Sequence, residues 1–152
     1  MWTRTLTHKT AETVKGIYAL IIRLDRDVNV KVGALGEIGF LEGLYVYVGS
    51  AQTTLEKRVE RHLRKEKSLY WHIDYLLNMA AAKIEEVLWL EAAKSVECTL
   101  SQKVGTRGEA VKGFGCSDCN CTSHLFRVGD GLNGRLMVRV LFVAPILLSV
   151  RG

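Results

Sequence analysis

The sequence predicts an α/β or α+β domain, in which a small mixed, largely antiparallel sheet is flanked by helices. Runs rich in β-branched and aromatic residues alternate along the chain with segments whose apolar residues recur at helical spacing. The chain has 152 residues, the size of one domain with a substantial core. We see no internal repeat and no long linker, so we expect residues 1–152 to form a single domain.

The first half of the chain predicts three strands. Residues 16–24 (GIYALIIRL) are rich in β-branched and aromatic residues, which favour strands. Residues 28–32 alternate apolar and polar side chains, and the intervening Asp25-Arg26-Asp27 favours a hairpin with the first strand. Residues 43–49 (GLYVYVG) form the third expected strand, with glycine at both ends.

The periodicity then changes to that of a helix. Thr53 and Glu56 have the spacing of a capping box, in which two side chains satisfy the first N–H groups of a helix. One apolar stripe follows at intervals of four residues: Leu55, Val59 and Leu63. We expect this helix to continue to about residue 67.

The second half of the chain alternates again between helix and strand. In order, we expect a helix at 71–82, a strand at 86–91, a helix with Ser95 as N-cap, a glycine-rich loop at 105–115, and strands at 124–128 and 135–143. Asp130-Gly131 and Asn133-Gly134 predict a turn between the last two strands. Residues 129–152 are expected to be a C-terminal extension, whose apolar run at 136–150 forms a buried strand or a subunit contact.

The composition favours a polyanionic partner and a reducing compartment. Lys and Arg number 21 against 16 Asp and Glu, giving a formal charge of +5 and a pI near 9.1. Such a surface attracts nucleic-acid phosphates, although the same charge also serves solubility. There is no signal-peptide pattern, and no apolar run reaches the ~20 residues of a membrane span, so we expect no membrane association. Three of the four cysteines lie too close together for a secreted disulfide framework, which favours the cytoplasm.

Two tripeptides and the helix that follows them carry a specific resemblance. The first is Gly16-Ile17-Tyr18, and the second is Tyr47-Val48-Gly49. The segment YVGSAQTTLEKRVERH (47–62) is similar to the centre of the GIY-YIG endonucleases, which include phage-type homing enzymes and the excision nuclease of bacterial repair. Val48 replaces the isoleucine that gives the second tripeptide of that family its name.

Two downstream segments extend the resemblance over about residues 16–128. VECTL (96–100) stands where the GIY-YIG family has its metal-binding glutamate. GFGCSDCNCTSHLF (113–126) resembles a short, stand-alone and mainly archaeal branch of that superfamily. The resemblance therefore implies a GIY-YIG-like domain that cleaves nucleic acid with a divalent metal.

The resemblance implies five catalytic residues, and their chemistry suits phosphodiester hydrolysis: Tyr18, Tyr47, Arg58, His62 and Glu97. Glu97 offers hard carboxylate oxygens to Mg²⁺ or Mn²⁺, and Arg58 offers a fork of fixed positive charge to a phosphate. One of the tyrosines orients or deprotonates the attacking water. His62 lies one helical turn after Arg58, where it shuttles a proton or contacts a phosphate. Taken singly, each residue also has a structural interpretation, such as core packing for the tyrosines.

Four further basic residues of the same helix predict contacts to nucleic-acid phosphates: Lys57, Arg61, Arg64 and Lys65. Phosphate contacts dominate the affinity of proteins for nucleic acids. The structural alternative is a solvated basic helix face without a ligand.

The cysteines raise a separate question about zinc. The expected ligands, as in the mainly archaeal branch, are Cys98, Cys119, Cys121 and His124, whereas Cys116 is an addition of this sequence. A site that includes Cys98 is easier to build than four ligands from one tight loop. The alternatives are packed free thiols, a disulfide between Cys98 and a loop cysteine, or a His124 that lines the cleft with Asp118 beside Glu97.

The expected function is that of a metal-dependent endonuclease hydrolysing phosphodiester bonds of DNA or RNA, with Mg²⁺ or Mn²⁺ as cofactor and zinc as a candidate second metal. DNA is the expected partner. Because no separate DNA-binding module is visible, a homo-oligomer or a partner protein is expected to supply that surface. One alternative is a non-catalytic nucleic-acid-binding module that uses the basic helix 55–67. Another is a zinc-stabilised interaction module.

Overall fold

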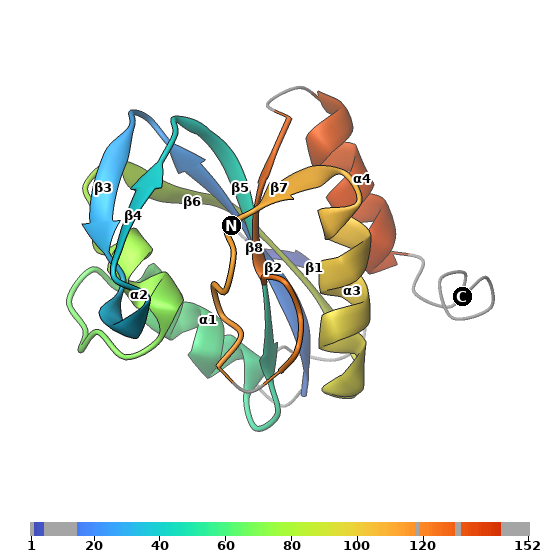
Figure 1. Cartoon of the computed structure of the whole chain (residues 1–152). Coiled ribbons are helices and arrows are strands. Elements are labelled where there is room, and N and C mark those ends of the chain that lie inside the picture. The colour runs from blue at the N-terminus through green and yellow to red at the C-terminus, as the bar shows by residue number, and fades with distance from the viewer. Residues whose placement is uncertain (1, 5–14, 118, 130–131, 144–152) are drawn as a thin grey trace.

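The computed structural model describes residues 2–4, 15–117, 119–129 and 132–143 (Figure 1). Its strands are β1 (Trp2–Arg4), β2 (Gly16–Leu24), β3 (Val28–Lys31), β4 (Glu37–Phe40), β5 (Gly43–Ala51), β6 (Ala82–Glu91), β7 (Gly108–Ala110) and β8 (Leu125–Val128). Its helices are α1 (Leu55–Leu63), α2 (His72–Leu77), α3 (Ser95–Gly105) and α4 (Leu132–Val143), and η2 (Gly33–Leu35) is a short 3-10 turn. The expected α+β fold is confirmed.

The centre of the molecule is a six-stranded sheet with the order β1-β6-β2-β5-β8-β7. All neighbouring strands run antiparallel except β1 and β6, which are parallel. The expected mixed, largely antiparallel sheet is therefore correct. Strand β2 lies between β5 and β6 and is buried on both faces, which explains why its sequence is almost continuously apolar.

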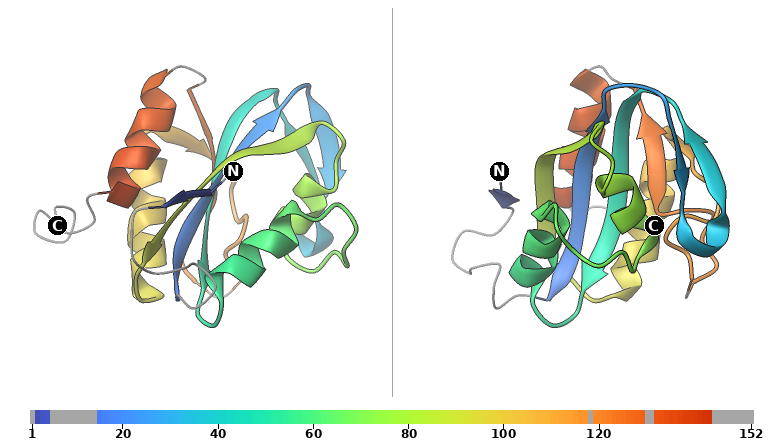
Figure 2. Two further views of the ribbon diagram at one scale, coloured as in Figure 1. Left: turned by 180° about the vertical axis from the view of Figure 1, so that it is seen from behind. Right: turned by 90° about the vertical axis from the view of Figure 1, so that its left-hand side faces the viewer.

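Both faces of the sheet are covered (Figure 2). Alternate residues of a strand point to opposite faces, so Tyr18 and Leu20 of β2 pack in the core under α1, α2 and the β3–β4 pair. Ile17 and Ala19 point the other way, into the core under α3 and α4. Tyr18 therefore lies on one face of the sheet, and Glu97, which is on α3, lies on the other. The two side chains can approach each other only at the end of the sheet.

The pairing of β2 with β5 brings the two tripeptides together. The strands are antiparallel in register from Gly16 opposite Ala51 to Leu24 opposite Gly43, which places Tyr18 opposite Gly49. The Tyr18 ring lies over Gly49, where a Cβ atom would approach its hydroxyl oxygen to 2.5 Å. Glycine at position 49 is thus required by the tyrosine of the neighbouring strand.

The hairpin expected between residues 16–24 and 28–32 is wrong. Strand β3 pairs with β4 in a separate two-stranded sheet. Both edges of β2 are already occupied by β5 and β6, so β2 has no edge left for β3. The alternating pattern instead reflects Val30 and Val32, which are buried against the central core.

Helix α1 is shorter than expected and begins differently. Its N-cap is Thr54, whose side chain makes no capping hydrogen bond, so the capping box of Thr53 and Glu56 does not form. The helix ends at Leu63, before residue 67. The ammonium group of Lys67 folds back and donates to the carbonyl oxygens of Arg61 (3.1 Å) and His62 (2.8 Å), which satisfies acceptors of the last turn.

Three further boundaries differ from the expected ones. The helix expected at 71–82 ends at Leu77, and β6 begins at Ala82 rather than at residue 86. Pairing of Ala82 with Leu24 of β2 here outweighs the helical propensity of the alanines. Ser95 is the first residue of α3 rather than its N-cap, which is Lys94.

The C-terminal part of the domain departs most from the prediction. The expected loop at 105–115 contains β7, which pairs with β8. Residues 135–143 lie in helix α4 and not in a strand, and three residues at helical spacing are buried against the sheet: Val138, Leu141 and Phe142. Gly134 is inside this helix, so the Asn133-Gly134 turn does not form. Residues 132–143 are thus part of the fold, whereas Asp130-Gly131 and residues 144–152 lie outside the described residues.

Within the described part of the chain, no helix combines the length and the apolar character needed to cross a membrane.

Candidate functional site

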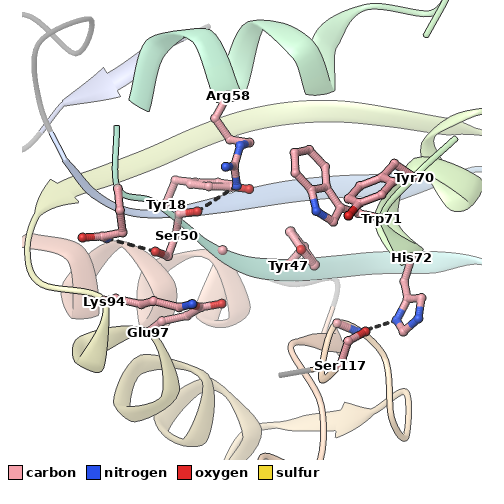
Figure 3. A pocket seen from close by; sticks show the side chains of 13 residues that line it. Tyr18, Tyr47, Ser50, Arg58, Tyr70, Trp71, His72, Lys94, Glu97 and Ser117 are labelled. Atoms are coloured by element: carbon pink, nitrogen blue, oxygen red, sulfur yellow. Dashed lines mark hydrogen bonds between the residues drawn. The ribbon is translucent and has the colours of Figure 1, made fainter. Parts of the chain in front are cut away.

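A cleft of about 630 Å³ opens at the end of the central sheet (Figure 3). Its walls come from β2, β5, α1, the start of α2, the start of α3 and the loop between β7 and β8. The lining residues are Tyr18, Tyr47, Gly49, Ser50, Gln52, Arg58, Tyr70, Trp71, His72, Lys94, Glu97, Gly115 and Ser117. The structure therefore brings together Tyr18, Tyr47, Arg58 and Glu97, four of the five expected catalytic residues.

Arg58 is held at the cleft by two contacts. Its guanidinium group donates a 2.9 Å hydrogen bond to the backbone oxygen of Ser50, at the end of β5. The same group lies 4.4 Å from the ring centre of Trp71, a cation–π distance. These contacts fix a positive charge in the cleft wall.

Arg61 contacts the same tryptophan, but it is engaged in an ion pair. Its guanidinium group lies 4.3 Å from the Trp71 ring centre and donates to both carboxylate oxygens of Asp74, at 2.8 and 2.9 Å. Asp74 is fully buried, and it also accepts the backbone N–H groups of Tyr70 and Trp71. Burial opposes ionisation of Asp74, but these hydrogen bonds outweigh it and lower its pKa. Arg61 and Asp74 thus anchor the segment that carries Trp71.

The fifth expected residue, His62, lies directly behind Tyr18. The Tyr18 hydroxyl is 2.7 Å from Nε2 of His62, and both side chains are buried. Burial lowers the pKa of His62 to about 3, and burial also raises the pKa of Tyr18, against the opposing charge of Arg58. Nδ1 of His62 has no hydrogen-bond partner among the described residues. The pair is therefore neutral at physiological pH.

Tyr47 completes the aromatic wall. Its ring centre is 6.4 Å from that of Tyr18 and 6.2 Å from that of His62. Desolvation raises the pKa of Tyr47 well above its usual range. Tyr47 is thus also a neutral phenol in the resting site.

Glu97 enters the cleft from the opposite side, in the first turn of α3. One carboxylate oxygen, Oε2, lies 3.0 Å from Nδ1 of His124. Burial lowers the pKa of His124, but hydrogen bonds to Glu97 and to the backbone of Val48 outweigh it and raise that pKa to about 9. His124 thus lies beside Glu97 but is not one of the residues that line the cleft, and Asp118, expected there with it, lies outside the described residues.

The soft ligands form a compact group behind Glu97, which we call the thiol cluster: Cys98, Cys119, Cys121 and His124. One ligand atom from each residue lies within 4.8 Å of all the others. A tetrahedral ion with bonds of about 2.3 Å to sulfur separates its ligands by about 3.8 Å, so small side-chain movements close the shell. The thiol cluster can therefore hold a metal ion. Cys116 is outside it, and all four cysteines are free thiols.

Hydrogen bonds favour the thiolate form of Cys119. Burial opposes its ionisation, but hydrogen bonds from the backbone of Cys121 and from His124 outweigh it and lower the pKa of Cys119. Burial raises the pKa of Cys121. Metal binding requires thiolates, so a metal would displace the remaining thiol protons.

The other basic residues of the α1 region lie in different surroundings. Lys57 and Arg64 are exposed and line a second hollow with Glu60 and Leu63. Lys65 is also exposed, and its ammonium group is 3.4 Å from the backbone oxygen of Ala82. These cations do not line the cleft.

Sequence reasoning missed several residues that line the cleft. Trp71 and His72 were expected only as the start of a helix, and Tyr70 was not singled out. Three adjacent aromatic rings beside a basic helix are themselves a signal of nucleic-acid binding. Nδ1 of His72 accepts the backbone N–H of Gly115 at 2.8 Å, which ties α2 to the cysteine loop. No sequence pattern predicts that contact, because it joins segments far apart in the chain.

Comparisons with known proteins place the chain in a family. No curated protein and no solved structure matches it. A family model described as "Domain of unknown function DUF123" matches residues 17–141, which include every residue of the cleft and of the thiol cluster. The chain therefore belongs to the DUF123 family.

Proposed function

We propose that this DUF123 chain is a metal-dependent nuclease of the GIY-YIG type that hydrolyses phosphodiester bonds of nucleic acid, with DNA as the first substrate to test. The observation that carries the proposal is the meeting of Tyr18, Tyr47, Arg58 and Glu97 in one cleft. They come from β2, β5, α1 and α3, and a purely structural role for each does not require them to share a cavity. Perturbed titratable groups that meet in a cleft are typical of catalytic sites.

Arg58 is the phosphate-binding group of the proposed site. Its position is set by Ser50 and Trp71, neither of which neutralises its charge. A guanidinium group matches two phosphate oxygens at once and stays charged at every relevant pH. It stabilises the charge that develops on the phosphate during cleavage.

Glu97 is the proposed ligand of Mg²⁺ or Mn²⁺. Magnesium is often held by one or two carboxylates and completes its shell with water and substrate oxygens, so a single glutamate at an open cleft fits. When bound there, the ion supplies charge stabilisation to the phosphate oxygens.

Tyr18 is the proposed acceptor of the proton of the attacking water. As it accepts that proton, its own hydroxyl proton passes to Nε2 of His62, 2.7 Å away. Burial alone makes this transfer uphill, because it raises the pKa of Tyr18 and lowers that of His62. The charge of Arg58 lowers the pKa of Tyr18 and so favours its phenolate, but the same charge lowers the pKa of His62 and opposes its protonation. A bound phosphate offsets this, because its negative charge favours protonated His62. Tyr47 lies beside the pair and orients the water.

We infer further that the thiol cluster binds zinc. Three thiolates and one imidazole are a common ligand set of structural zinc sites, whereas Mg²⁺ and Ca²⁺ prefer oxygen. Zinc there leaves Glu97, which is not a member of the thiol cluster, available to the hard ion in the cleft.

Cleavage assays with purified protein test the nuclease function. Labelled single-stranded, duplex and branched DNA and RNA are incubated with Mg²⁺ or Mn²⁺. We expect cleavage by the wild type, and a loss of about 10²-fold or more in rate for Arg58→Ala and for Glu97→Gln, because each removes a preorganised charge. Glu109→Gln removes an exposed carboxylate on β7 and is expected to cut normally.

Two outcomes would go against the proposal. Normal cleavage by Glu97→Gln would remove the metal-carboxylate assignment. Tight binding by the wild type without cleavage of any substrate would favour the non-catalytic binding module instead.

A further inference from the structure

His124 stands between the two candidate metal sites. Its ring is buried, with Nε2 3.3 Å from the sulfur of Cys119 and Nδ1 3.0 Å from Oε2 of Glu97. Nδ1 also lies 3.1 Å from the backbone oxygen of Val48, the middle residue of the second tripeptide. The imidazole of His124 thus contacts a cysteine of the thiol cluster, the carboxylate of Glu97 and the strand that carries Tyr47.

The partners of Nδ1 decide which ring nitrogen carries the proton. The Val48 carbonyl and the Glu97 carboxylate can only accept hydrogen bonds, so Nδ1 must be the donor. Ser101 Oγ, 3.2 Å from Nδ1, can accept as well. In the neutral ring, Nε2 then presents its lone pair to the thiols, which is the form that binds a metal.

Chain connectivity adds a second link. Cys98, a member of the thiol cluster, directly follows Glu97 in the first turn of α3. A metal bound to Cys98 and His124 would therefore hold Glu97 from two sides, through the helix backbone and through the Nδ1–H donor. The loop between β7 and β8, which carries Cys119 and Cys121, also brings Gly115 and Ser117 into the cleft wall.

We propose that the metal in the thiol cluster positions Glu97 through His124. Metal binding at the thiol cluster then sets the affinity of the cleft for its divalent ion. This rests on the proposed nuclease function and on zinc in the thiol cluster. His124 is then a positioning residue: it ligates one metal and orients the ligand of the other. Carboxylate–histidine–metal arrays of this kind fix the ring and the carboxylate together.

One substitution separates this role from simple zinc binding. His124→Cys offers zinc a fourth thiolate but has no N–H for Glu97. We expect it to keep about one zinc per chain, to bind Mn²⁺ about tenfold or more weakly, and to lose kcat while its KM for nucleic acid stays near the wild-type value. Mn²⁺ affinity is measured on the zinc-loaded full-length chain by electron paramagnetic resonance of the free ion. Cys116→Ser changes the same loop outside the thiol cluster and should match the wild type.

Wild-type Mn²⁺ affinity in a zinc-loaded His124→Cys protein would overturn the coupling and leave the nuclease proposal standing. A wild-type chain that holds zinc but binds no Mn²⁺ would overturn both. If His124→Cys does not fold, the wild type is loaded with Co²⁺ in place of zinc. We then expect Mg²⁺ to shift the visible spectrum of the cobalt site through His124. An unchanged spectrum at saturating Mg²⁺ would overturn the coupling.

Discussion

The hydrogen bond between Tyr18 and His62 is buried, and it makes the stability of the fold depend on pH. In the unfolded chain His62 has an ordinary pKa of about 6.5, whereas burial lowers it to about 3 in the folded protein. Above about pH 6.5 both states hold a neutral ring, and the pair contributes its full stability. Below that pH His62 binds a proton in the unfolded state but not in the folded state.

Stability should therefore fall as the pH falls from about 6.5 towards 3, by about 1.4 kcal/mol for each pH unit once well below 6.5. Urea unfolding at pH 7.5 and 5.5 measures this. We expect the wild type to lose about 1.4 kcal/mol more than His62→Gln, which keeps a hydrogen-bonding group for Tyr18 but does not titrate. All other titrating groups are common to both proteins. An equal loss in the two would show that His62 is not held neutral.

Residues whose role follows from local pattern were predictable. Tyr18 and Tyr47 lie in tripeptides, and the antiparallel pairing of two adjacent strands is enough to bring them together. The burial of Asp74 was not predictable, because it depends on an ion pair with Arg61, thirteen residues earlier, as well as on nearby backbone N–H groups. Zinc ligation by Cys98 could be suggested, but its contact with the loop cysteines depends on how α3 packs.

At the scale of elements, the cations of α1 and of its C-cap, Arg64, lie in two different surroundings. Arg58 and Arg61 turn towards Trp71, whereas Lys57 and Arg64 are exposed to solvent. If the proposed nuclease function is correct, the second pair is placed to contact the backbone of a nucleic acid bound at the cleft. Arg61, expected as a fourth phosphate contact, has two of its N–H donors on Asp74.

Replacing Lys57 and Arg64 by Ala should weaken binding and flatten its dependence on salt. Each phosphate contact releases counterions, so log affinity falls with log salt by about 0.9 per phosphate on duplex DNA. We expect the double variant to lose up to about 1.8 from that slope, measured by fluorescence anisotropy on the same duplex at several salt concentrations. Lys31→Ala with Arg107→Ala removes the same charge from exposed positions outside α1. An equal change in both double variants would mean that net charge, and not α1, determines binding.

Elements were predictable where one local signal dominated. Strands β2 and β5 carry strong patterns, and they appear where expected. Helix α4 was misassigned because residues 135–143 are apolar on nearly every side, and only the packing of Val138 and Phe142 reveals helical spacing. Strands β4 and β7 have four and three residues, too few for a periodic pattern, and their partners define them.

At the scale of the molecule, the thiol cluster joins the two sides of the sheet. Cys98 belongs to α3, while Cys119 and Cys121 lie in the loop that leads to β8 and closes the cleft. Within this loop, the N–H of Gly113 donates to the oxygen of Thr122, and the N–H of His124 donates to the oxygen of Phe114. A metal at the thiol cluster would cross-link α3 to this loop, and it should therefore stabilise the domain.

The purified chain should accordingly carry about one zinc per molecule, and Cys119→Ser should release it. Structural zinc contributes directly to folding, and each kcal/mol lost lowers the Tm of a domain of this size by about 2–4 °C. We expect Cys119→Ser to melt well below the wild type and Cys116→Ser to melt close to it, because Cys116 is outside the thiol cluster. Elemental analysis gives the metal content, and mass spectrometry with and without reductant checks for a disulfide. Absence of zinc, with a melting curve that a chelator leaves unchanged, would reduce the thiol cluster to packed thiols. Such a result would leave Arg58 and the Tyr18–His62 pair in place in the proposed nuclease site, because their contacts do not pass through a cysteine.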